Sequence, residues 1–133
     1  MKSKLILPLL LLTAASFLVS LSTYQATTGP HGGKLKRAEN YLIELKMFNA
    51  DLYTYLLDQK LMPVGNKGIS CEIKFFTPDS AYVNTVLKPF REDGFILESN
   101  TIVYQSCKVI FKVPGKSVSA NFDNENVMVE KNK

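Results

Sequence analysis

The chain has 133 residues, which is enough for one small domain and little else. Its 16 Lys and Arg residues against 12 Asp and Glu residues give a net charge of +4, and two of those lysines stand within the first four residues. A charge this small and this scattered excludes a nucleic-acid-binding surface, which needs a clustered basic face. One histidine and no Gly-rich loop between a strand and a helix also argue against an enzyme.

Residues 1–22 are typical of an export segment. Lys2 and Lys4 precede an apolar run at residues 5–21 that carries no charge, and this order is the pattern of a secretory signal. Cleavage after Ser22 is one interpretation. An uncleaved membrane anchor is the other, because the run reaches the lower limit of about 17 residues for a membrane span. Both predict an N-terminal hydrophobic helix and place the remainder of the chain in the periplasm or cell envelope.

Residues 23–40 are expected to be a linker, because they are rich in Thr, Gly and Lys and show no sustained apolar period. From residue 41 the pattern changes to short apolar runs that are separated by turn residues, which is typical of strands. The seven expected strands are 41–48, 52–57, 69–76, 81–87, 95–98, 105–113 and 117–122. Residues 124–133 are expected to be a polar tail.

The strand pattern predicts an all-β domain over residues 41–123. Seven runs at near-regular spacing, without an amphipathic helix, favour an immunoglobulin-like sandwich of two antiparallel sheets. A small barrel is the alternative, since it closes the same kind of core.

Two cysteines, Cys71 and Cys107, fall on the inward faces of predicted strands. An exported protein meets an oxidising environment, so a disulfide is permitted. The bridge would close a separation of 36 residues and stabilise the domain by roughly 4 kcal/mol. The alternative is a pair of buried free thiols that pack as small apolar side chains. We favour the disulfide.

The single imidazole of the chain, His31, lies between glycines in the stretch Gly-Pro-His-Gly-Gly at residues 29–33. An imidazole ligates Zn²⁺ or Cu²⁺, and glycines allow the backbone to approach a ligand closely. Structural zinc takes four ligands, so one imidazole predicts at most weak metal binding. Glu44 is a weaker second candidate, because alternation places it on the solvent face of its strand. The alternative is that His31 is a loop residue without a ligand, and no tightly bound cofactor is expected.

Two stretches, residues 30–44 and 55–64, carry a resemblance to known proteins. Pro-His-Gly-Gly, a short spacer and aromatic-x-Ile-Glu are followed by Tyr-Leu-Leu-Asp-x-x-x-x-Pro-Val, and residues 115–122 fit the same pattern. This order resembles a group of uncharacterised exported bacterial β-domain proteins, most familiar from Bacteroidota. Similar segments occur near adaptor subunits of heavy-metal efflux pumps. The resemblance implies an exported β domain and, by association, a connection with metals.

These observations lead to two hypotheses about function. The first is a non-enzymatic accessory or binding domain of the bacterial cell envelope, linked to heavy-metal handling or efflux. Its expected partner is an envelope protein or an efflux component, with membrane contact through the N-terminal segment if that segment is uncleaved. The alternative is a structural or protein-interaction sandwich that has no metal role and pairs with a partner through an exposed strand edge.

Overall fold

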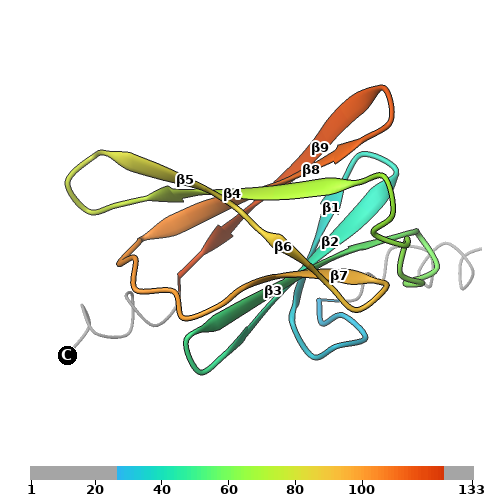
Figure 1. Ribbon diagram of the computed structural model, residues 1–133, viewed down its shortest axis with the longest axis horizontal. Coiled ribbons are helices and arrows are strands. Elements are labelled where there is room, and N and C mark those ends of the chain that lie inside the picture. Colours follow the sequence, from blue (N-terminus) through green and yellow to red (C-terminus); the bar gives the residue numbers. More distant parts are fainter. Residues whose placement is uncertain (1–26, 125–133) are drawn as a thin grey trace, which may run out of the picture.

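The computed structural model describes residues 27–124, in which nine strands form two antiparallel sheets (Figure 1). One sheet has the strand order β1-β2-β3-β7-β6 and the other has the order β5-β4-β8-β9. The strands are β1 (Lys34–Ala38), β2 (Tyr41–Phe48), β3 (Asp51–Leu57), β4 (Ser70–Phe76), β5 (Tyr82–Val86), β6 (Lys88–Phe90), β7 (Gly94–Leu97), β8 (Ser106–Val113) and β9 (Lys116–Asp123). The described part of the chain contains no helix long and apolar enough to cross a membrane.

The predicted sandwich of two antiparallel sheets is confirmed, and each of the seven expected strands corresponds to an observed one. The predicted linker is wrong at β1, which pairs along its whole length with β2, so the sandwich begins at residue 34 and not at 41. An edge strand with charged side chains needs no apolar period, and only Ala38 of β1 is buried. The export segment of residues 1–22 and the expected tail beyond residue 124 lie outside the described residues.

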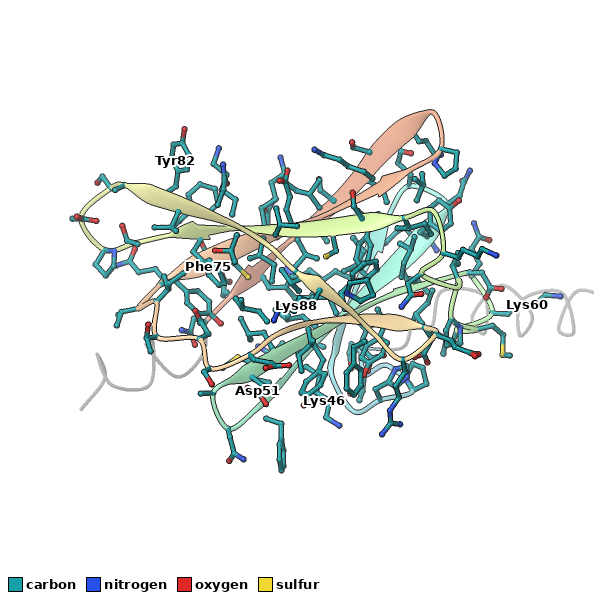
Figure 2. All side chains as sticks on the ribbon, in the orientation of Figure 1. Lys46, Asp51, Lys60, Phe75, Tyr82 and Lys88 are labelled. Carbon is teal, nitrogen blue, oxygen red and sulfur yellow. The ribbon has the colours of Figure 1, made fainter. Side chains whose placement is uncertain are left out.

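The core lies between the two sheets and is built from alternate residues of their strands. Phe75, Phe111 and Phe122 are fully buried, and the rings of Phe95 and Phe111 meet edge to face at 5.7 Å. Figure 2 shows Phe75 between the sheets and Tyr82 pointing away from them. Burial of these rings is the main stabilising contribution for so small a domain.

The two cysteines are both buried in this core as free thiols, so the predicted disulfide is wrong. Cys71 pairs across the ladder with Phe111, whereas Cys107 pairs with Phe75. Four residues therefore separate the two cysteines along neighbouring strands, a distance of about 13 Å. A disulfide needs Cα atoms within about 7 Å. The thiols share a face of the sheet but lie too far apart to bridge.

Both thiols should be unreactive in the folded protein. Burial raises the pKa of Cys71 and of Cys107 to about 12, so at pH 8 neither is a thiolate. We expect slow alkylation by iodoacetamide at pH 8 and rapid alkylation in urea. Because the unfolded pKa is about 8.5, the stability that protonated thiols contribute should be complete below that pH and fall as the pH rises towards 12. A chain that cannot be alkylated in urea without a reductant would contradict these assignments.

Candidate functional site

The glycine-rich stretch at residues 29–33 forms a tight loop that leads into β1. An isolated bridge joins Thr28 to Lys34, and the Gly29 amide donates a hydrogen bond of 2.9 Å to the Gly33 carbonyl. Gly32 has a φ of +85°, a conformation that favours glycine over other residues. In Figure 1 the loop lies on the face of the five-stranded sheet that points away from β4, β8 and β9. The loop thus covers sheet surface that would otherwise face solvent.

Beneath this loop, Glu44, Tyr55 and Gly94 form a row of cross-strand neighbours on β2, β3 and β7. Gly94 leaves room for the tyrosine, since a Cβ atom there would lie 2.6 Å from the Tyr55 ring. The imidazole of His31 stacks on this ring, with centroids 3.5 Å apart and planes 5° from parallel. The ring of His31 therefore has a fixed plane and does not project freely from a linker.

Glu44 is fully buried, contrary to the solvent-facing position that alternation predicts. The reason is the loop, whose donors surround the carboxylate. Glu44 Oε2 accepts hydrogen bonds from the amides of His31 at 2.9 Å and Gly33 at 2.8 Å, and Oε1 lies 2.8 Å from His31 Nδ1. An ionised carboxylate only accepts hydrogen bonds, so opposite a Glu44 carboxylate the Nδ1 atom is the donor to Oε1. The carboxylate thereby orients the imidazole.

The other imidazole nitrogen, Nε2, faces the carboxylate of Asp93 at 3.4 Å from Oδ2. Asp93 belongs to the turn before β7, which Asn66 holds in place. The Asn66 side-chain amide donates to the carbonyls of Arg91 at 3.0 Å and Gly94 at 2.9 Å. His31 and Asp93 have side chains that are 24% and 35% exposed, so both are accessible to a small ion.

The electrostatic environment of the His31 ring is negative. Burial raises the pKa of the Tyr55 phenol, and the charges of Asp93 and Glu44 raise it further, while Arg91 lowers it. The same carboxylates that disfavour a tyrosinate anion favour a cation beside the stacked rings. A cation between Nε2 and Asp93 would therefore lie in an attractive potential.

This arrangement has the elements of a metal site with an incomplete set of ligands. A histidine that ligates a metal through one nitrogen commonly donates its other N–H to a carboxylate, as His31 does to Glu44. Two ligands about 2.0 to 2.2 Å from a tetrahedral ion are about 3.4 Å apart, and Nε2 and Asp93 Oδ2 have this separation. Residues 27–124 contain no group of three or more His, Cys, Asp or Glu side chains placed to hold a metal. Protein side chains thus offer two ligands here.

The structure brings the two predicted metal residues together, but in different roles. His31 presents Nε2 to Asp93, whereas both oxygens of Glu44 accept hydrogen bonds from the loop, so Glu44 is an orienting residue. Sequence reasoning missed Asp93, which falls between the expected strands 81–87 and 95–98, and Tyr55, which lies within the expected strand 52–57. Tyr55 does open the second stretch of the family resemblance, so that resemblance was the available signal.

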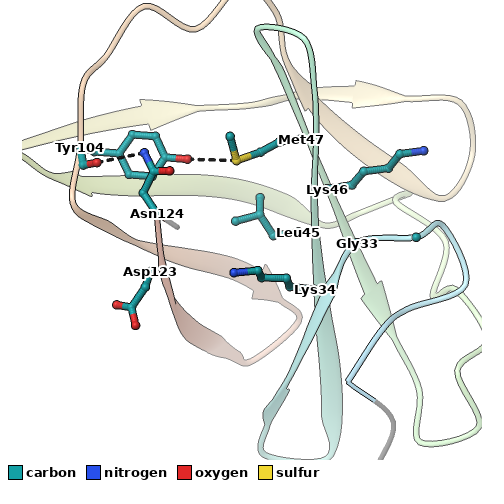
Figure 3. A pocket seen from close by; sticks show the side chains of 9 residues that line it. Gly33, Lys34, Leu45, Lys46, Met47, Tyr104, Asp123 and Asn124 are labelled. Carbon is teal, nitrogen blue, oxygen red and sulfur yellow. Dashed lines mark hydrogen bonds between the residues drawn. The ribbon is translucent and has the colours of Figure 1, made fainter. Parts of the chain in front are cut away.

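A separate groove of about 330 Å³ lies beside the same loop, between β2 and the end of β9 (Figure 3). On one wall the Tyr104 hydroxyl donates to Met47 Sδ at 3.5 Å, and burial raises the pKa of that phenol to about 12. The Asn124 amide donates to the Tyr104 carbonyl at 3.0 Å. The groove is lined by Gly32 and Gly33 of the loop but not by His31, Glu44 or Asp93. It is therefore distinct from the candidate metal site.

The arrangement of His31, Glu44 and Asp93 is the main basis for assigning a role to this protein. Comparison with known proteins finds no family model, no curated protein and no solved structure that is significantly similar to this chain.

Proposed function

We propose that this chain is a non-enzymatic binding domain of the bacterial cell envelope that holds a divalent transition-metal ion, Zn²⁺ or Cu²⁺, through His31. The observation that carries the proposal is the direction of the imidazole. Glu44 fixes Nδ1, and Nε2 faces the Asp93 carboxylate at a separation of 3.4 Å. Imidazole and carboxylate are both ordinary ligands of these metals.

Binding at this site is weak and exchangeable. Two side chains leave at least two positions of a tetrahedral ion to water or to another molecule, whereas structural zinc sites close all four. Partial exposure of His31 and Asp93 gives a second molecule access to those positions. This openness suits an accessory domain that passes a metal to an envelope partner such as an efflux component, and not one that stores it.

Export to the periplasm and an immunoglobulin-like topology belong to the same proposal. The order β2-β3-β7-β6 corresponds to strands A, B, E and D of an immunoglobulin domain, and β4-β8-β9 corresponds to C, F and G. In this correspondence β5 takes the place of the additional strand beside C. Such sandwiches carry their binding functions on loops and strand edges, and the His31 loop is one of these.

Titration of the exported protein with Zn²⁺ tests the proposal. We expect measurable weak binding to the native chain and none to the His31→Ala variant. Asp93→Asn should weaken binding by roughly tenfold, and Glu44→Gln, which changes only the orienting partner, should weaken it about 10- to 100-fold. The matched control is Asp123→Asn, an exposed aspartate on β9 that should leave binding unchanged.

Nitrogen-15 NMR of the imidazole distinguishes the proposed geometry from an adventitious one. Zn²⁺ should shift the Nε2 resonance, while Nδ1 remains protonated through its contact with Glu44. In the Zn²⁺ titration, equal heats of binding to the native and His31→Ala proteins, or no heat with either, would contradict a metal role. The Pro-His-Gly-Gly loop would then serve the geometry of the chain, and the structural or protein-interaction alternative would stand.

A further inference from the structure

The four strands at the edges of the two sheets differ in how well they are protected against pairing with other chains. Three of them carry the usual devices that block edge-to-edge association. β1 presents the charged residues Lys34, Lys36 and Arg37; β6 has three residues, one of them Pro89; and β9 lies beside β1, which covers it. The fourth edge strand is β5.

β5 has none of these devices. Its sequence, Tyr-Val-Asn-Thr-Val, contains no charge, proline or glycine and consists largely of good strand formers. The strand pairs with β4 in continuous register without a bulge. Its apolar side chains are exposed, with Tyr82 at 58% and Val86 at 70%. In Figure 1, β5 forms the outer margin of its sheet, and in Figure 2 Tyr82 points into solvent.

The free backbone groups of β5 can be identified from the hydrogen bonds at its two ends. The amide of Leu87 donates to the Cys71 carbonyl at 2.9 Å, and the amide of Thr77 donates to the Ala81 carbonyl at 3.1 Å. In an antiparallel ladder, hydrogen-bonded and non-hydrogen-bonded residues alternate. Residues 83 and 85 therefore bond to β4, and the amides and carbonyls of Tyr82, Asn84 and Val86 point to the open edge.

We propose that β5 pairs with β5 of a second copy of this chain, antiparallel about a two-fold axis at Asn84. This register sets Asn84 opposite Asn84 of the second copy and sets Tyr82 opposite Val86. Because these residues hold the free amides and carbonyls, the pairing forms about six backbone hydrogen bonds. It joins the two four-stranded sheets into one and does not depend on the proposed metal site.

The side chains favour a second copy as the occupant of this edge. In this register each Tyr82 meets a Val86, an aromatic and β-branched pair that stabilises antiparallel strands. The Lys74 ammonium lies 4.0 Å from the Tyr82 ring centroid, so the tyrosine is already oriented. Between the two copies, the like charges that come nearest each other are the two Lys74 side chains. They are three strand spacings, or about 14 Å, apart, which exceeds the screening length at physiological salt. The two-fold pairing also closes, so it gives a dimer.

Sedimentation equilibrium of the exported protein and of its Asn84→Asp variant tests the proposal. Asn84 lies opposite Lys74 of its own sheet, so the substitution adds an attractive pair within one copy. Between two copies it places two carboxylates directly opposite each other. We expect a concentration-dependent dimer for the native chain and at least a tenfold weaker dimer for Asn84→Asp.

A charge-complementation experiment makes the test specific for the register. Asn84→Asp and Asn84→Lys should each dimerise poorly, and their mixture should form heterodimers because opposite charges then meet. The matched control is Asn121→Asp on β9, which also lies opposite a lysine of its own sheet, Lys108, and should dimerise like the native chain. A native chain that stays monomeric, a dimer that Asn84→Asp leaves unchanged, or a mixture without heterodimers would overturn the proposal.

Discussion

Replacing Glu44 with alanine should destabilise the domain by about 3 to 5 kcal/mol, the cost of removing one partner from a buried charged interaction. The side chain is fully buried, and its two oxygens accept three hydrogen bonds from the loop at residues 29–33. Alanine would leave the amides of His31 and Gly33 and the His31 ring without acceptors. Each unsatisfied buried donor costs about 1 to 3 kcal/mol. Urea unfolding of the native and Glu44→Ala proteins measures the loss.

The Glu44→Gln variant separates the effect of the negative charge from the effect of the side-chain shape. Glutamine keeps the volume and one accepting oxygen, so it should cost less, about 1 to 2 kcal/mol. Its NH2 group cannot accept a hydrogen bond from Nδ1–H, so the imidazole should lose the contact that orients it.

The matched control is Glu72→Ala on β4. Glu72 has a side chain that is 28% exposed, and its ion pair with Lys112 is long, at 3.9 Å. Exposed pairs of this kind contribute at most about 1 kcal/mol. If Glu44→Ala cost no more than Glu72→Ala, the carboxylate would not be what holds the glycine loop on the sheet.

The sequence predicts most clearly the strands whose residues alternate between core and solvent. β4 and β8 show this pattern throughout, because one face of each meets the opposite sheet. β1 and β6 escaped prediction for a physical reason. They are edge strands whose backbone pairing holds them in place, and such pairing leaves no apolar period in the sequence. For the same reason, the predicted linker extended to residue 40, whereas β1 begins at Lys34.

The candidate site was predicted in part, since His31 and Glu44 were both selected. Their roles depend on features that alternation does not encode. Glu44 is buried because a loop, and not the second sheet, covers its face of β2. Asp93 reaches His31 only because β7 pairs with β3 in a register that places Gly94 beside Tyr55. Long-range register of this kind cannot be derived from local pattern.

The cysteines illustrate the same limit. Alternation correctly places Cys71 and Cys107 on the inward face, because both are buried between the sheets. It does not specify which residues lie opposite each other, and the observed register separates the two thiols by four residues along the ladder. Two cysteines on neighbouring strands must share a face of the sheet to form a disulfide. The register of the strands then decides whether their Cα atoms are close enough.

Replacing Gly33 with alanine should destabilise the domain by about 2 to 3 kcal/mol. A Cβ atom at Gly33 would lie 2.5 Å from the backbone carbonyl oxygen of Leu45. That carbonyl belongs to β2, which pairs with β1 on one side and β3 on the other, so it has little freedom to move. The loop must lift instead, which breaks the 2.8 Å hydrogen bond from the Gly33 amide to Glu44. Zn²⁺ binding should be lost together with stability.

Gly32→Ala is the control that separates close packing from backbone conformation. Gly32 has a φ of +85°, and a Cβ atom there would meet no other atom within 4 Å, so alanine should cost about 1 to 2 kcal/mol through conformation alone. The contacts of His31 with Glu44 and Tyr55 remain possible, and Zn²⁺ binding should survive. Gly115→Ala, at a φ of +82° in the distant turn between β8 and β9, should match Gly32→Ala in stability and leave binding untouched. If Gly33→Ala resembled these two variants in urea unfolding and in Zn²⁺ titration, close contact between the loop and β2 would not be what positions His31.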